Sequence, residues 1–251
     1  MRTVALFSAL VAALSLVPRA QEPNSVVRGA AEAMGVAALQ SIQYSGTGSA
    51  FAIGQAASPG GPWPRFELAK YVASVDYTTP AMREETVRRD VERPPRGGGA
   101  GPFTPATGQG GMRPIPGDVV QSLVRDGRTE AGLVQIWMTP HGFLRAAATK
   151  SVLTKPVQMD GRTLQAVSFD VGGRPLTAYI NDQHLVERIA TVTANPLLGV
   201  MPIEAIFSGY KDYSGVRFPT RIVQRQGGHP TLEVTVADVR PNAGAGTPSA
   251  S

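Results

Sequence analysis

The chain has 251 residues, 42% of them hydrophobic, which is enough to build a sizeable apolar core within one or two domains. Its 24 basic and 19 acidic residues give a formal net charge of +5, and because the arginines are scattered along the chain, nucleic-acid binding is not expected. The chain has no cysteine, so disulfide bonds and lipid attachment through cysteine are excluded.

Residues 1–20 have the pattern of a secretory signal peptide. Arg2 gives a positive start, residues 3–17 form an apolar run, and Ala20 provides a small residue at the expected cleavage point. An uncleaved membrane anchor is the alternative, but a membrane-spanning helix needs roughly 20 apolar residues. We therefore expect export to the periplasm or the extracellular space, with membrane contact only during export.

A single domain is predicted over residues 21–242, and it begins with an amphipathic helix. Asn24 and Ser25 offer N-cap oxygens, and apolar residues recur every three or four positions from Val27 to Ile42. Segments in which apolar and polar residues alternate come next, as expected of long antiparallel strands. The predicted strands occupy residues 43–53, 65–79 and 81–92.

Residues 93–117 contain eight glycines and six prolines, which predicts a mobile loop that buries almost nothing. Six more strands are predicted after residue 150, and the short Gly-Gly, Asn-Asp or Ser-Gly connections between them indicate a meander. Residues 243–251 form a predicted disordered tail. The six strands occupy residues 163–171, 174–180, 185–193, 203–213, 217–226 and 231–239.

Alternation also predicts the pairing of the last hairpin. A two-residue turn at residues 227–228 would place the apolar Ile222 opposite Glu233. We therefore predict a three-residue turn over residues 226–228, which pairs Ile222 with Leu232. A bulge, or a shift by two residues, would preserve the faces of the strands but change these pairs.

Residues 135–150 hold the candidate binding site. Thr139 is a good N-cap and Pro140 suits the first helical position, so His141 lies at the second, where the helix dipole favours a neutral imidazole. We predict a mainly β (α+β) fold, in which this second helix near 140–150 packs in or across a curved antiparallel sheet, an open half-barrel. Burial in the core is the alternative role for its side chains. The predicted ligand-binding residues are Trp137, Met138, His141, Phe143 and Leu144.

No residue pattern in the sequence predicts catalysis or metal binding. His141, His184 and His229 are the only histidines, they lack the spacing of known zinc motifs, and there is no G-x-S-x-G sequence. We therefore predict a protein that is not an enzyme and has no metal or other cofactor. A hidden acid–base pair among carboxylates that alternate with apolar residues, a pattern typical of a solvated face, is the alternative. These carboxylates are Glu84, Glu85, Asp118, Asp126, Asp170 and Glu204.

Residues 30–66, 135–147 and 195–242 resemble the N-terminal region that precedes the catalytic domain in a group of exported bacterial metallo-β-lactamase-fold hydrolases. That region is itself similar to the half-barrel of the Lol-type lipoprotein carriers, which implies an open sheet with a helix in its mouth. The hydrolases hold zinc through an H-x-H-x-D-H motif. Since this chain contains no such motif, no catalytic residue of the family has a counterpart here.

Together, these patterns predict an exported, non-catalytic module that binds an apolar small molecule, a lipid or a partner protein. One alternative is an accessory domain or subunit of a zinc-dependent hydrolase, with a metallo-β-lactamase-fold hydrolase as its partner. The other is a structural protein of the cell envelope.

Overall fold

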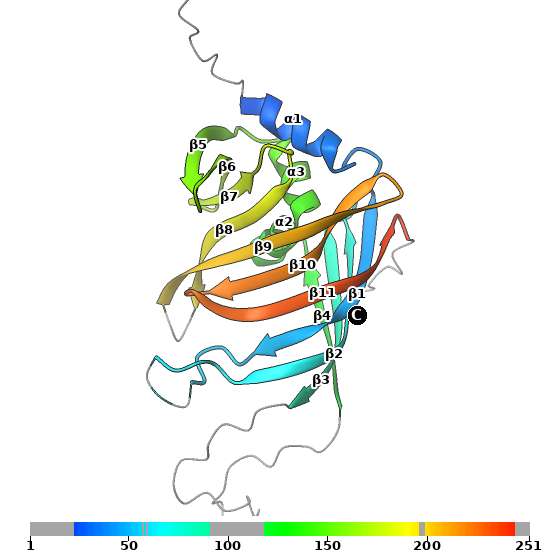
Figure 1. Ribbon diagram of the computed structural model, residues 1–251, viewed down its shortest axis with the longest axis vertical. Helices are drawn as coiled ribbons and strands as arrows, with labels where there is room; N and C mark the ends of the chain where they lie inside the picture. The colour runs from blue at the N-terminus through cyan, green and yellow to red at the C-terminus, as the bar shows by residue number, and fades with distance from the viewer. Residues whose placement is uncertain (1–22, 57, 59, 91–117, 196–198, 244–251) are drawn as a thin grey trace, which may run out of the picture.

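The computed structural model describes residues 23–56, 58, 60–90, 118–195 and 199–243 (Figure 1). In these ranges, eleven strands form one open antiparallel sheet with the order β4-β3-β2-β1-β11-β10-β9-β8-β7-β6-β5. Neighbours in the sheet are also neighbours in the sequence, except where β1 pairs with β11. The predicted fold class, mainly β with a curved antiparallel sheet and few helices, is confirmed.

The bounds of the elements follow the chain from the N-terminal helix to the long C-terminal hairpin. The helices are α1 (Pro23–Ala33), α2 (Glu130–Trp137) and α3 (Pro140–Ala147). The strands are β1 (Ser41–Phe51), β2 (Arg65–Asp76), β3 (Ala81–Asp90), β4 (Val119–Asp126), β5 (Leu153–Met159), β6 (Arg162–Val171), β7 (Arg174–Ile180), β8 (Val186–Asn195), β9 (Gly199–Tyr213), β10 (Val216–Gln226) and β11 (His229–Pro241).

The three helices gather at one end of the curved sheet, and α2 and α3 lie within its concavity (Figure 1). Helix α2 contacts α3, β3 and β4, whereas α1 contacts α3, β5 and β6. Buried apolar side chains of all three helices join those of the concave face in one core. Each large side chain that is fully buried there, such as Phe143 or Phe218, stabilises the fold by about 1.5–3 kcal/mol. No helix in the described part of the chain combines the length and apolar character needed to span a membrane.

The N-terminal helix is shorter than its apolar periodicity predicts. It ends at Ala33, and Gly35 adopts a φ of 70°, a left-handed conformation that ends helices and favours glycine. A Cβ atom on Gly35 would lie 2.1 Å from the carbonyl oxygen of Gly215, so a side chain would also clash there. The prediction of a continuous helix to Ile42 is wrong, because Ile42 belongs to β1. The apolar spacing from Val27 to Ile42 therefore spans two different elements.

The centre of the chain contains elements that the sequence reading did not predict, namely β4, α2 and β5. The predicted helix near 140–150 is present as α3, but Trp137 ends α2 and Met138 is the C-cap of that helix. Thr139 then caps α3. Two residues, Met138 and Thr139, therefore connect the short helices α2 and α3. Side chains before and after this connection reach different parts of the concavity.

The last hairpin has a two-residue turn at Gly227 and Gly228, so the predicted three-residue turn is wrong. The register shifts between Gln224 and Arg225, where Thr231 is the additional residue of a bulge. Ile222 consequently pairs with Val234 and not with Leu232. The predicted faces are confirmed, because the bulge restores the alternation that a regular two-residue hairpin would have broken.

Three predicted segments lie wholly or largely outside the described residues. They are the signal peptide at 1–20, the loop at 93–117 and residues 244–251 of the tail. Ala243, the first residue of the predicted tail, is described, and its carbonyl oxygen accepts a hydrogen bond of 3.1 Å from Ser41 Oγ.

Candidate functional site

The start of α3 has the predicted capping structure. Thr139 Oγ1 accepts a hydrogen bond of 3.2 Å from the Gly142 amide, and Pro140 occupies the first turn. His141 follows and is completely buried. Burial lowers the pKa of His141 to about 4, although a hydrogen bond with the Met34 carbonyl opposes the shift. The expected neutral imidazole is confirmed, but burial is its main cause.

His141 joins three elements of the fold. Its Nε2 lies 3.1 Å from the carbonyl oxygen of Met34. A carbonyl oxygen can only accept, so Nε2 carries the proton and donates it to the end of α1. The imidazole ring stacks on Phe218 of β10 with a centroid distance of 5.8 Å. Nδ1 is buried without a hydrogen-bond partner. This geometry makes His141 a connection between α1, α3 and the sheet.

The other four predicted site residues separate into a closed and an open environment. Phe143 and Leu144 are completely buried in the core. Trp137 is partly buried, its ring lies edge-on to Phe169 at 5.8 Å, and the Lys150 ammonium group lies 5.1 Å from the ring centroid. Of the five residues, only Met138 lines a large cavity.

This concave cavity has a volume of about 500 Å³ and lies beside the α2–α3 junction. Its walls come from seven neighbouring strands of the sheet, β4 to β1 and β11 to β9. Apolar side chains form much of the wall. They are Ala50, Phe51, Ile53, Leu68, Leu123, Met138, Ile203 and Leu232.

A shielded acidic group lies in the wall of the concave cavity. Tyr71 Oη donates a hydrogen bond of 2.7 Å to one oxygen of Glu84, and Arg125 Nε donates one of 3.1 Å to the other. The side chain of Glu84 is only 11% exposed and that of Arg125 is 29% exposed. Burial, together with neighbouring Tyr44 and Glu84, raises the pKa of Tyr71 well above its ordinary value, so its hydroxyl remains a donor. Both oxygens of the carboxylate are therefore occupied.

The remaining charged groups of the concave cavity differ in how they are paired. Glu204 lies between Arg188, at 3.4 Å, and Arg225, at 3.7 Å. Arg88 has no carboxylate within ion-pair distance among the described residues. Its guanidinium carbon instead lies 4.1 Å from the centroid of the Phe66 ring, and its Nε is buried without a hydrogen-bond partner. Among the described residues that line the concave cavity, Arg88 is thus the one cation without a carboxylate partner.

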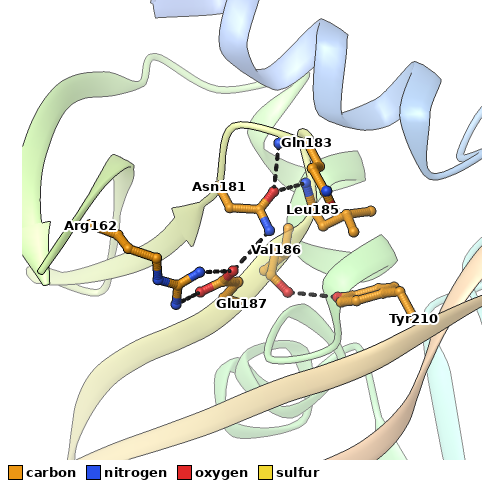
Figure 2. Close-up of polar contacts among 7 residues, drawn as sticks. All are labelled: Arg162, Asn181, Gln183, Leu185, Val186, Glu187 and Tyr210. Carbon is orange, nitrogen blue, oxygen red and sulfur yellow. Dashed lines mark hydrogen bonds and ion pairs between the residues drawn. The ribbon is translucent and has the colours of Figure 1, made fainter. Parts of the chain in front are cut away.

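A second cavity, of about 490 Å³, lies beside the β7–β8 turn, and several of the polar groups around it are bonded to one another (Figure 2). Arg162 donates to both oxygens of Glu187, at 2.9 and 2.8 Å. Asn181 Nδ2 donates to the same carboxylate at 2.8 Å, and Tyr210 Oη donates to the Val186 carbonyl at 2.6 Å. Burial opposes ionisation of Glu187, but the hydrogen bonds from Arg162 and Asn181 outweigh it and hold its pKa below the ordinary value.

These contacts stabilise the β7–β8 turn. Asn181 Oδ1 accepts hydrogen bonds from the backbone amides of Gln183 and Leu185, at 3.0 and 2.9 Å (Figure 2). His184 between them adopts a φ of 59°, a conformation that is uncommon for a residue with a side chain. Arg162, Glu187 and Asn181 already have partners, so these three groups are less free to bind a ligand than Arg88 of the concave cavity is.

The histidines lie in separate parts of the fold. His141 is in the core, His184 is in the β7–β8 turn, and His229 stacks on Trp63 with a centroid distance of 4.8 Å. Over the described ranges, no group of three or more His, Cys, Asp or Glu side chains is arranged to hold a metal ion.

The sequence reading missed the polar residues of the concave cavity. It interpreted Glu84 as a carboxylate on a solvated face, which is wrong, because Glu84 faces the concave cavity and is bonded to Tyr71 and Arg125. The sequence of β3 does indicate this site, because Glu84 and Arg88 lie at even spacing from Met82, which is buried, and so share its face of the strand. Charged residues on the apolar face of a strand indicate a site with its own polar partners.

Comparisons with known proteins assign no family to the chain. No family model matches it, and no curated protein matches its sequence. A solved structure of a LolA superfamily protein from Nitrosomonas europaea is similar with a TM-score of 0.44 and 10% identity, over 88% of this chain and 94% of that one. A DUF1329 family protein from Desulfovibrio piger has a TM-score of 0.41 and 10% identity, over 88% and 93% of the two chains. At TM-scores below 0.5, neither similarity establishes a family or a function.

Proposed function

We propose that this protein is an exported, non-catalytic module that binds an apolar or amphipathic small molecule in the concave cavity. The observation that carries the proposal is the cavity itself, about 500 Å³ of open space with an apolar wall beside Met138. This volume lies within the range of roughly 300–1,000 Å³ that is common for small-molecule sites. The signal-like residues 1–20 support export.

The residues around the concave cavity favour binding over catalysis. Among the described residues that line it there is no histidine, serine or lysine that could act as a base or nucleophile. Glu84, the most shielded acid in the wall, already accepts hydrogen bonds from Tyr71 and Arg125. These two contacts give Glu84 a structural role, because it orients Tyr71 and Arg125 in the wall of the cavity.

A matched pair of variants on β4 tests the proposal. Leu123 lines the concave cavity and is 48% exposed, whereas the next residue, Val124, is 47% exposed and points to the other face of the strand. The apolar dye N-phenyl-1-naphthylamine serves as a fluorescent probe for the purified protein. We expect Leu123→Glu to weaken dye binding at least about tenfold, because it places a charge in the apolar wall. Val124→Glu should change it less than about twofold.

Two results would refute binding in the concave cavity. One is the absence of saturable dye binding to the folded wild-type protein. The other is an equal effect of Leu123→Glu and Val124→Glu, which would mean that the dye binds elsewhere or that the edge strand has been disrupted. Circular dichroism of each variant separates these two causes.

The resemblance of residues 30–66, 135–147 and 195–242 to the region before metallo-β-lactamase catalytic domains supports a second candidate function. In that case the module is an accessory subunit of a separately encoded zinc hydrolase. Co-purification of the chain with such a hydrolase from its own cell envelope would support this assignment. A hydrolase whose activity and migration are unchanged by the purified chain would count against it.

A further inference from the structure

The charges of the concave cavity do not balance. Three arginines and two glutamates line it, and four of these five groups form ion pairs, Arg125 with Glu84 and Arg225 with Glu204. Arg88 is the fifth, and no hydrogen bond or ion pair joins its side chain to any described residue. A guanidinium group cannot lose its proton in a protein, so this charge persists at every physiological pH.

The surroundings of Arg88 fix its orientation and leave its donors free. The guanidinium group lies over the ring of Phe66, which stabilises the cation without using its N–H groups. Its Nε is removed from water and has no hydrogen-bond acceptor. A buried donor without an acceptor costs free energy that a bound acceptor can recover. The guanidinium group of Arg88 is therefore positioned to donate hydrogen bonds to an oxygen atom of a ligand.

Arg88 also lies away from Glu84, the shielded acid of the cavity. It is four residues beyond Glu84 on β3, which corresponds to roughly 13 Å along an extended strand. Its cross-strand partners are Leu68 on β2 and Val119 on β4. The apolar wall, including Met138, is left to accommodate the hydrocarbon part of a ligand whose polar end reaches Arg88.

We propose that Arg88 is the head-group subsite of the concave cavity and that the ligand is an amphiphile with an anionic head, a carboxylate or a phosphate, on a hydrocarbon tail. This inference rests on the proposed function, because it assigns one end of the same ligand. The planar guanidinium fork binds either anion through two parallel hydrogen bonds. The head group supplies the charge and the acceptors that Arg88 lacks.

Four compounds, tested as competitors of N-phenyl-1-naphthylamine on the wild-type protein, distinguish the contribution of the head group from that of the tail. They are dodecanoate, dodecyl phosphate, dodecanol and inorganic phosphate. At least one of the two anionic amphiphiles should bind about tenfold or more tightly than dodecanol, which corresponds to the usual strength of a charge-assisted hydrogen bond. Inorganic phosphate, which has no tail, should displace no dye at the concentrations that suffice for dodecyl phosphate.

The substitution Arg88→Gln should remove the preference for the anionic head and leave the affinity for dodecanol unchanged. Arg88→Lys, which keeps the charge but loses the planar fork, should give an intermediate preference and provides the test if Arg88→Gln does not fold. The matched control is Arg89→Gln, because Arg89 is the adjacent residue on the opposite face and forms an exposed ion pair with Asp118. The control should retain the wild-type preference.

The outcomes distinguish the head-group subsite from the proposed function. Equal binding of dodecanoate, dodecyl phosphate and dodecanol, or a preference that survives in both Arg88 variants, would overturn the subsite but leave apolar binding intact. Displacement by inorganic phosphate alone would replace the amphiphile with a free anion. Failure of every probe to bind would overturn both proposals.

Discussion

The concave face of the sheet is closed beneath α3 and open beside Met138, although one continuous sheet forms both regions. In the closed region, Phe143, Leu144 and His141 fill the space against the sheet and are completely buried. In the open region, inward positions of β3 and β4 carry Glu84, Arg88 and Arg125. The same curvature therefore produces a core in one place and a cavity in the other.

The closed and open regions differ in the free energy that burying their side chains would cost. An apolar helix that packed onto Arg88 would bury an uncompensated charge, which costs far more than the burial of apolar area returns. Packing onto Phe169 and Phe218 carries no such penalty. The polar residues on β3 and β4 thus keep part of the concavity open, at the expense of core that the fold would otherwise gain.

The largest effect expected from this comparison is that of a substitution in the closed region. Phe143→Ala should lower the free energy of unfolding by about 3–5 kcal/mol, because it removes a completely buried ring and leaves a void. Urea denaturation measures this change, and Val124→Ala, at a 47% exposed position, is the control with an expected change below about 0.5 kcal/mol. Dye affinity of the folded variant should stay within about twofold. A stable variant without dye binding would mean that the two regions are one site.

The next effect is a pH dependence that originates in the closed region. The folded-state pKa of His141 is about 4, well below the value near 6.5 that is usual for an unfolded chain. Between these values the unfolded chain binds the proton and the folded protein does not, so stability is lost as the pH falls from 6.5 towards 4. Between pH 7 and pH 5 this amounts to about 2 kcal/mol.

Urea denaturation of wild-type and His141→Gln proteins at the two pH values isolates this contribution. Glutamine can still donate to the Met34 carbonyl, but it does not titrate, so the variant should lose about 2 kcal/mol less than the wild type on acidification. If His141→Gln lost as much stability on acidification as the wild type, His141 would be solvated or protonated in the folded state.

The elements that local patterns specify were predicted, and those that depend on distant contacts were not. Alternation and capping residues gave most of the strands, the start of α3 and the faces of the last hairpin. The prediction of the β10–β11 register failed. Alternation shows that a regular two-residue turn at Gly227 and Gly228 would pair an apolar residue with a charged one, but a longer turn and a bulge at Thr231 correct this equally well.

The candidate site was predicted only in part for the same reason. Met138 was identified, but Tyr71, Glu84 and Arg125 come from three strands. Glu84 and Arg125 are 41 positions apart in the chain, and the pairing of β3 with β4 brings them close enough to form their hydrogen bond. Local alternation places Glu84 on one face of β3 without saying which face becomes concave. Only the order of strands in the sheet turns that face towards α2 and Met138.

The smallest expected effect separates the concave cavity from the cavity beside the β7–β8 turn, which has nearly the same volume. Arg162→Met removes an ion pair with Glu187 in which the arginine side chain is 59% exposed and screened by solvent, so we expect almost no change in stability. Asn181 still donates to Glu187, and dye affinity should not change. If Arg162→Met weakened dye binding and Leu123→Glu did not, the ligand site would lie beside the β7–β8 turn. The assignment depends on pairing and not on volume, because Arg162 is paired with Glu187, whereas the side chain of Arg88 has no ion-pair partner among the described residues.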